Sequence, residues 1–513
     1  MSALLLRRAR LGAAVRDVLL DAGRVVAVAD DLTAGAPGLP GLPAGLEVVD
    51  LDGAVLLPGL VDAHVHLAQE AAARRRIDVS AARSATEAAA LVARVVQAAP
   101  PEPGAVVVAA GFRDALWSAP PSAAVLDDAL DTLLPDVPVV LGSGDLHTAW
   151  GNTAAVRRFG LSSPTGVVRE HEAMDVLARA AAVDVAVLDG WVLEATAAAA
   201  ARGVTAVVDF EYDDLVPAWA RRAARVPGGP SLRVRTAVYV DRLEQAIAAG
   251  LRSGDPLPGV TDPVASERLR MGPLKVFVDG SLGTRTAFCS TAYPGVPGQE
   301  SHGLLRTPLP ELERLLRRGA SCGLDLAVHA IGDRAVEVAL DGFAAAGCTG
   351  RVEHAQQVAP ADLPRFAELG VVASVQPRHA VDDRDAADRH WAGATGRAFP
   401  YRALVDAGAE VLLGSDAPVA ALDPWDGIAS AVHRSLDGRP AWHPEQHLDL
   451  DVALAAASGG RRAVRVGDPA DLVVVAEPPA AVLARDGVAG LRATEVLGTL
   501  VAGRWTHRSP ALA

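Results

Sequence analysis

Strand-like and helix-like segments alternate over most of this 513-residue chain. From Pro58 onward, short apolar runs recur, and helical patterns such as 309–319 and 335–346 lie between many of them. Repeated strand–helix units predict an α/β fold with a parallel sheet or a closed barrel. The strand-like runs are 106–108, 137–141, 206–208, 234–240, 274–278, 324–328, 371–375 and 411–413. Their number and span favour a (β/α)8 TIM barrel over an open sheet.

The two ends of the chain have a different pattern. Residues 1–57 contain short strand-like runs joined by turns, and residues 463–513 are strand-like again. We therefore predict that both ends share one small β-domain, with the barrel over 58–462. The segment at about 68–175 holds more helix and loop than one strand–helix unit requires. An insertion over the barrel mouth is expected there.

Composition limits the kinds of molecule that the protein can bind and the compartment in which it works. Half of the residues are hydrophobic and the net charge is -14, so we expect a globular protein with no nucleic-acid partner. No run of about 18 apolar residues occurs, which predicts no membrane span. The three cysteines have no CxxC spacing, and the N-terminus lacks a signal-peptide pattern, so a cytoplasmic protein is expected. A homo-oligomer is left open.

One lysine, Lys275, stands among 48 Lys and Arg residues. It lies inside the apolar run 274–278, where an unpaired charge is costly. An amine can lose its proton and react, whereas a guanidinium stays charged. This context favours a chemical role for Lys275 over a chance placement.

A pair of histidines, His64 and His66, lies two residues apart in the strand-like segment PGLVDAHVHL. Alternate residues of a strand project from one face, so both imidazoles lie side by side. Two nitrogen ligands in that arrangement suit a zinc-type ion. Taken alone, a His-x-His pair can also be a surface or packing feature.

Four more groups lie in or just after apolar runs: Lys275, His329, His354 and Asp416. In a barrel, the carboxyl-terminal ends of the strands meet at one mouth, where active sites are built. Taken singly, each histidine could be a core group and the aspartate a helix cap. The full set in this order indicates a functional site.

These motifs resemble those of the amidohydrolase superfamily, and most closely amidohydrolase family 3, which includes N-substituted formamide deformylase-like enzymes. The matching segments run from about residue 48 to about 475: PGLVDAHVHL, LDDALDTLLPDVPVVLGSGDLHTAWGN, GPLKVFVDGSLGTRTA, LAVHAIGDRAV, RVEHAQQV, SVQPRHAVDD, LLGSDAPV and ADLVVV. The resemblance implies a distorted (β/α)8 barrel beside a β-sandwich built from both chain ends. It also implies a metal site of His64, His66, Lys275, His329, His354 and Asp416.

The resemblance further implies a mechanism. In the binuclear branch of the superfamily a carboxylated lysine bridges two metals, so two divalent ions, expected to be zinc, and a carbon dioxide-derived carbamate on Lys275 are implied. A metal-activated hydroxide would attack the substrate carbonyl, with Asp416 as general acid/base. The reaction would hydrolyse a non-peptide carbon–nitrogen bond in a small-molecule substrate: an amide, formamide or cyclic amide. Two alternatives stay open: ester or lactone hydrolysis by the same site, and a non-catalytic barrel that binds or assembles other molecules.

Four residues are candidates for contact with substrate. His147 lies in DLHTAW, which is similar to an Asp-x-His-x-x-Trp stretch of the family. Arg285, Arg378 and His379 could contact a polar or anionic substrate group, or else serve as ion-pair and loop residues. The segment 161–172 is compressed relative to the family, so the substrate is not carried over.

Overall fold

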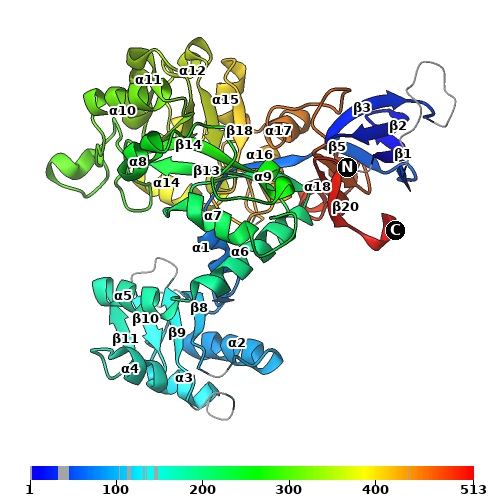
Figure 1. Ribbon diagram of the computed structural model, residues 1–513. Helices are drawn as coiled ribbons and strands as arrows, with labels where there is room; N and C mark the ends of the chain where they lie inside the picture. The colour runs from blue at the N-terminus through cyan, green and yellow to red at the C-terminus, as the bar shows by residue number, and fades with distance from the viewer. Residues whose placement is uncertain are drawn as a thin grey trace. The chain divides into compact units, whose positions relative to one another are not determined.

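A computed structural model of the chain describes residues 3–32, 45–102, 104–112, 117–130, 133, 136–143, 148–436 and 438–512 (Figure 1). The chain forms two compact units, one of Met1–Glu70 with Val192–Ala513 and one of Ala71–Trp191. The second unit overlaps the insertion predicted at about 68–175 and continues to Trp191. Across the described residues, no helix has the length and apolar content needed to cross a membrane.

The first unit contains an eight-stranded parallel sheet whose neighbours follow chain order. Its strands are β6 (Leu60–Val65), β12 (Val204–Asp209), β13 (Arg233–Tyr239), β14 (Leu269–Phe277), β15 (Leu326–Ala330), β16 (Arg351–His354), β17 (Val372–Val375) and β18 (Val411–Leu413). This arrangement and the separate sheet built from both chain ends confirm the predicted fold class. The runs 106–108 and 137–141, which were counted toward the barrel, form strands of the second unit instead. Short apolar runs do not reveal which sheet they join.

The barrel is nearly closed where its first and last strands meet. Asp416 donates its backbone N–H to the carbonyl of His64 (2.7 Å), and His66 donates its own to the carbonyl of Ala417 (2.8 Å). The chain can approach this closely because residue 414 is glycine: a Cβ there would lie 2.7 Å from the backbone nitrogen of His64. Closure therefore brings the segment after β18 against the His-x-His segment of β6.

Helices follow the barrel strands and cover the sheet (Figure 1). Helix α10 shows why they form: Leu312, Leu315 and Leu316 recur at helical spacing on its buried face, while charged residues take the other face. The helices of this unit are α6 (Val185–Ala200, shared with the second unit), α7 (Leu215–Ala223), α8 (Leu243–Ala248), α9 (Pro263–Arg268), α10 (Leu309–Ser321), α11 (Asp333–Ala346), α12 (Leu363–Leu369), α13 (His379–Asp382), α14 (Arg384–His390), α15 (Tyr401–Asp406), α16 (Pro424–Val432), α17 (Leu450–Ala456) and α18 (Pro479–Arg492).

Both chain ends contribute to a separate eight-stranded sheet in the same unit. Its strands are β1 (Leu4–Leu11), β2 (Ala14–Asp21), β3 (Arg24–Ala29), β4 (Glu47–Asp50), β5 (Val55–Pro58), β19 (Leu472–Val475), β20 (Val496–Val501) and β21 (Arg504–Arg508). The antiparallel pairing of β5 with β19 joins the N-terminal strands to the C-terminal ones. Strand β5 ends two residues before β6, so this sheet leads directly into the barrel.

The second unit has its own five-stranded sheet, in the order β11-β10-β9-β8-β7. The strands are β7 (Ile77–Asp78), β8 (Val107–Phe112), β9 (Val139–Ser143), β10 (Thr148–Gly151) and β11 (Val167–Arg169). Its helices are α2 (Ala85–Ala98), α3 (Ala123–Leu130), α4 (Thr153–Phe159) and α5 (Glu170–Ala180), and α1 (Leu67–Ala73) leads in from the barrel. Helix α2 begins at Ser84, whose hydroxyl accepts the N–H of Glu87.

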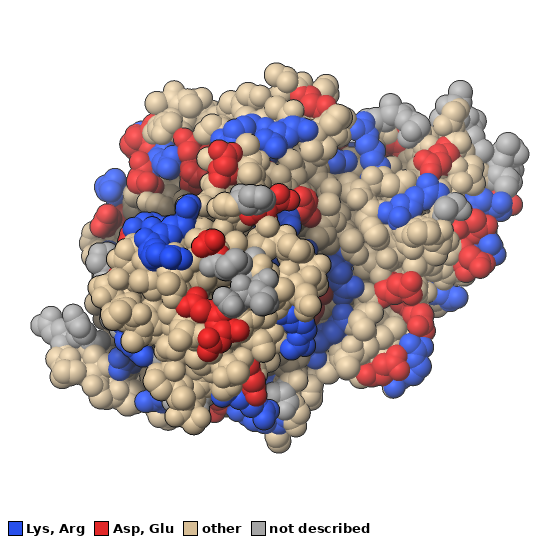
Figure 2. Space-filling model, turned by 90° about the horizontal axis from the view of Figure 1, so that it is seen from below, with Lys and Arg blue, Asp and Glu red and all other residues tan. Residues whose placement is uncertain are grey.

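Surface charges are largely mixed on the face drawn in Figure 2, where basic and acidic groups alternate. Exposed ion pairs such as Arg318–Glu244 and Arg485–Glu477 join neighbouring groups of opposite charge. Pairs in high dielectric contribute little to stability. The buried apolar core carries most of the folding energy.

A polar contact ties the barrel to the sheet built from both chain ends. The Asp471 carboxylate accepts two hydrogen bonds from Arg233 (2.7 and 3.1 Å) and one from the backbone N–H of Ala502 (2.7 Å). We expect Asp471→Ala to lower the free energy of unfolding by about 2–3 kcal/mol, because three partly buried donors lose their acceptor. The control variant Asp325→Ala removes the exposed partner of Arg235, which lies on the same strand as Arg233. It should change the free energy of unfolding by less than about 1 kcal/mol. Urea unfolding compares the two; equal shifts would contradict this account.

Candidate active site

The six predicted groups meet at the carboxyl-terminal ends of the barrel strands. His64 lies in β6 and His66 just beyond it, Lys275 lies near the end of β14, and His329 lies in β15. His354 ends β16, and Asp416 follows β18. All but His66 are buried. The topology therefore gathers residues spread over about 350 positions of the chain at one mouth.

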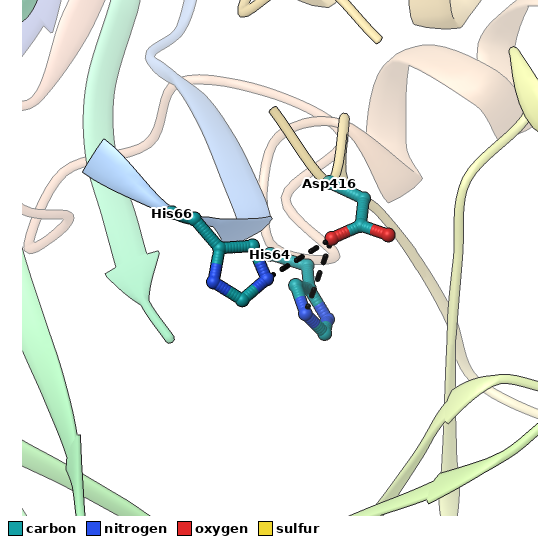
Figure 3. Close-up of side chains that lie close together, drawn as sticks. All are labelled: His64, His66 and Asp416. Carbon is teal, nitrogen blue, oxygen red and sulfur yellow. Dashed lines mark ion pairs between the residues drawn. The ribbon is translucent and has the colours of Figure 1, made fainter. Parts of the chain in front are cut away.

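Asp416 lies against the pair His64 and His66, with its carboxylate facing both rings (Figure 3). Its Oδ1 lies 3.6 Å from Nε2 of His64 and 3.3 Å from Nε2 of His66. Its Oδ2 lies 4.0 Å from Nδ1 of His354 and 3.8 Å from Nε2 of His379. The spacing of these groups would allow His64, His66 and Asp416, or His354, His379 and Asp416, to hold an ion.

Lys275 extends its amine into an apolar and aromatic pocket. The side chain is 1% exposed, and its Nζ lies 4.3 Å from the ring centre of Phe210 and 5.4 Å from that of Phe277. Among the described residues Nζ has no hydrogen-bond partner. Burial lowers the pKa of Lys275 to about 8. An orphaned, easily deprotonated amine beside the histidines is suited to covalent modification.

His64 is held from behind by a carboxylate. Its Nδ1 lies 2.7 Å from Oε2 of Glu353, a side chain with no exposed surface. Glu353 forms an ion pair with Arg351, which also donates to the carbonyl of Ala63. Burial alone would raise the pKa of Glu353, but Arg351 and His64 bring it down to about 2. An ionised Glu353 fixes the proton of His64 on Nδ1 and leaves Nε2 free as a ligand.

Two more histidines have acceptors behind them. Nδ1 of His354 lies 2.9 Å from Oε1 of Gln376, whose Nε2 donates to the carbonyl of Ser374 and so fixes the amide orientation. Nε2 of His329 lies 3.0 Å from the carbonyl of Gly280. Each ring therefore keeps one unprotonated nitrogen, the form that binds a metal ion.

Burial keeps these imidazoles neutral. Desolvation, assisted by the charge of Lys275, lowers the pKa of His64 to about 4 and that of His329 to about 3. Asp416 behaves in the opposite way: burial opposes its ionisation, yet the facing imidazoles hold its pKa well below the usual value. Neutral histidines around an ionised carboxylate are the protonation states that metal binding requires.

The backbone is strained at the same place. His354, Ala355 and Asp416 have positive φ angles of 76°, 42° and 57°. Such conformations of non-glycine residues cost about 1–3 kcal/mol each and persist where the surrounding structure imposes them. Their concentration at the mouth is typical of a functional site.

The candidate substrate residues are distributed differently. His379 lies at the mouth, at the start of α13, whereas the guanidinium of Arg378 is occupied by Asp382 and Asp426. Arg285 is exposed in the loop after β14, and in the described structure no hydrogen bond or ion pair joins it to the six groups. His147 lies outside the described residues.

The sequence did not reveal the residues behind the histidines. Glu353 directly precedes His354 in β16, and an acidic residue next to a predicted ligand was the available signal. Gln376 gave no signal, because an amide near a strand end is common. Phe210, which packs against both Lys275 and the ring of His64 at 4.3 Å, looked like an ordinary core residue.

Comparisons with known proteins agree with this fold and with the family that the motifs resemble. A model of the amidohydrolase family matches residues 47–507. Protein LONG AFTER FAR-RED 3 of Arabidopsis thaliana is 28% identical over 453 residues, covering 80% of this chain and 74% of its own. N-substituted formamide deformylase of Arthrobacter pascens is 26% identical over 551 residues, covering 95% and 94%.

Among solved structures, a metal-dependent hydrolase from Pyrococcus horikoshii OT3 has a TM-score of 0.72 at 24% identity, covering 93% of this chain and 98% of its own. This likeness shows a shared fold. The family match spans most of the chain and confirms the resemblance seen in its motifs. The chain belongs to the amidohydrolase family, and it is a hydrolase.

The buried amine of Lys275 is expected to lower the stability of the metal-free protein. A charged, unpartnered amine favours the unfolded state, so Lys275→Met should stabilise the metal-free protein at pH 7 by on the order of 3 kcal/mol. Because the folded pKa is the lower one, this difference should shrink as pH rises from about 8 toward 10.5. Lys275→Arg, which keeps the charge, should not stabilise. Urea unfolding at several pH values measures this; a less stable Lys275→Met protein would contradict it.

Proposed function

We propose that this protein is a metal-dependent amidohydrolase that cleaves a non-peptide carbon–nitrogen bond in an amide, formamide or cyclic amide. The observation that carries the proposal is the meeting of Asp416, four histidines and Lys275 at the barrel mouth, where the lysine amine has no hydrogen-bond partner among the described residues. A formamide deformylase among the relatives, alike over nearly its whole length, supports this class of substrate.

The metal ligands in this proposal are the six groups at the mouth. His64, His66, His329, His354 and Asp416 supply nitrogen and oxygen donors that suit two zinc ions. Lys275 joins them after its neutral amine adds to carbon dioxide and loses a proton, which yields an anionic carbamate. Arginine at this position could not react in this way. When bound, the ions would polarise the substrate carbonyl and lower the pKa of a water molecule.

The chain's own residues then move the proton. Asp416 is ionised, so it can accept a proton from the attacking water. The same carboxyl returns that proton to the nitrogen as the carbon–nitrogen bond breaks, which lets the amine leave uncharged. Glu353 and Gln376 hold His64 and His354 in the required tautomers throughout.

The setting of the enzyme is part of the proposal. The three cysteines are unpaired in the structure, and Cys289 is buried. A chain that forms no disulfides fits the cytoplasm. Residues 58–462 with an insertion are proposed as the catalytic barrel, and 1–57 with 463–513 as its β-domain.

Metal content and activity test the function together. The purified protein should hold close to two divalent ions per chain by elemental analysis and should turn over a member of a panel of N-substituted formamides, N-acyl amines, cyclic amides and lactones. Asp416→Asn should reduce turnover by on the order of 10²-fold or more while metal is retained, because an amide cannot relay the proton. A folded, metal-free and inactive wild type would support a binding or assembly role; turnover of lactones alone would support the ester alternative.

The carboxylate behind His64 should control metal affinity. Glu353→Gln removes the charge that fixes the tautomer of His64, and we expect metal affinity to fall by about 10–100-fold. Glu368→Gln changes an exposed acid on α12 (Leu363–Leu369) and should leave affinity unchanged. Competition with a chelator of known affinity measures both variants. If Glu353→Gln and wild type bind metal with equal affinity, Glu353 has no role in metal binding.

A further inference from the structure

His379 differs from the other histidines of the mouth in what lies behind it. Nε2 of Gln356 lies 3.2 Å from Nδ1 of His379. In this orientation an amide N–H donates to Nδ1, so Nδ1 carries a lone pair and the ring proton lies on Nε2. His64, His354 and His329 each face an acceptor instead: a carboxylate, an amide oxygen and a carbonyl.

The opposite nitrogen of His379 points toward the reacting groups. Its Nε2 lies 3.8 Å from Oδ2 of Asp416. A protonated Nε2 is attracted to this ionised carboxylate, whereas a lone pair there would be repelled by it. The position of Asp416 and that of Gln356 therefore indicate the same tautomer independently.

The fold holds His379 firmly in this position. The residue is 5% exposed, and its Nε2 has no hydrogen-bond partner among the described residues. Its backbone N–H donates to the carbonyl of Gln376, and its ring lies nearly parallel to that of His354, with the planes 8° apart. A buried donor without a partner is costly, so a bound molecule is expected to satisfy it.

We propose that His379 is a hydrogen-bond donor to the substrate oxygen that becomes negatively charged during hydrolysis, and is not a metal ligand. The proposal rests on the proposed function. A substrate atom in contact with Asp416 lies within reach of Nε2, because the two groups are neighbours. The N–H strengthens its bond as the carbonyl oxygen gains charge and is not transferred. Gln356 is the positioning residue that sets the tautomer.

Spacing alone would also allow His354, His379 and Asp416 to hold an ion. That alternative requires an unprotonated Nε2 on His379, and therefore a proton on Nδ1 facing Gln356. The two assignments thus predict opposite tautomers and opposite effects on metal content. Both can be measured on the whole enzyme.

Metal content separates a donor from a ligand. His379→Ala should hold as many ions per chain as wild type, whereas His354→Ala, the matched control on the neighbouring ring, should lose metal. With the best panel amide, His379→Ala should lower kcat by about 10²–10³-fold with a smaller change in KM. His379→Gln, which keeps an N–H, should recover part of this loss. Loss of an ion from His379→Ala, or retained metal with unchanged kcat, would overturn the proposal.

The tautomer can be read without any substrate. Nitrogen NMR of the metal-loaded protein labelled at histidine, assigned with His379→Ala, should show His379 protonated at Nε2. Gln356→Glu places a carboxylate on Nδ1 and should move the proton there, while Gln356→Leu should weaken the preference. A wild-type proton on Nδ1 overturns the proposal whatever the activity. A wild type that holds metal but hydrolyses no panel member, with Nε2 protonated, counts against the proposed function and leaves His379 assigned as a donor.

Discussion

Closure of the barrel between β6 and β18 is the constraint on which the site depends. The backbone of Asp416 donates to the carbonyl of His64, and that of His66 donates to the carbonyl of Ala417. These two hydrogen bonds join segments about 350 residues apart and place the carboxylate against the histidine pair. The glycine at 414 is required for this approach, because a side chain there would collide with β6. The candidate metal site is thus assembled by the same contacts that complete the fold.

A layer of buried polar groups then assigns each imidazole its chemistry. Rings backed by acceptors keep a free nitrogen for a metal, as Glu353 does for His64 and Gln376 for His354. A ring backed by a donor becomes a donor itself, which is the case of His379 with Gln356. The residue type alone does not reveal these roles; the neighbour behind the ring does.

Much of this could be predicted from the sequence. The strand–helix alternation predicted the barrel. The positions of His64, Lys275 and Asp416 beside apolar runs predicted a site at the barrel mouth. Sheet membership could not be predicted, so 106–108 and 137–141 were assigned to the barrel although they form β8 and β9 of the second unit. Apolar runs of similar length look alike in any sheet, and only the three-dimensional pairing separates them.

The buried polar groups behind the histidines also could not be predicted from the sequence, because the residues in contact have no regular spacing along the chain. Glu353 reaches His64 across 289 positions, and Gln356 reaches His379 across helix α12 and strand β17. Arg378 shows the converse: its sequence context suited substrate binding, yet Asp382 and Asp426 occupy its guanidinium. Charge in a motif does not show which partner a side chain will find.

The central claim is that the one lysine of the chain serves as a carbamate shared by two ions. Its buried amine, lowered pKa and lack of a partner among the described residues all depend on one apolar pocket beside Phe210. A crystal structure of the metal-loaded enzyme tests this most directly. The account predicts density for a planar carboxylate on Nζ of Lys275, in contact with two ions. A bare amine with a single ion bound by the histidines would contradict it.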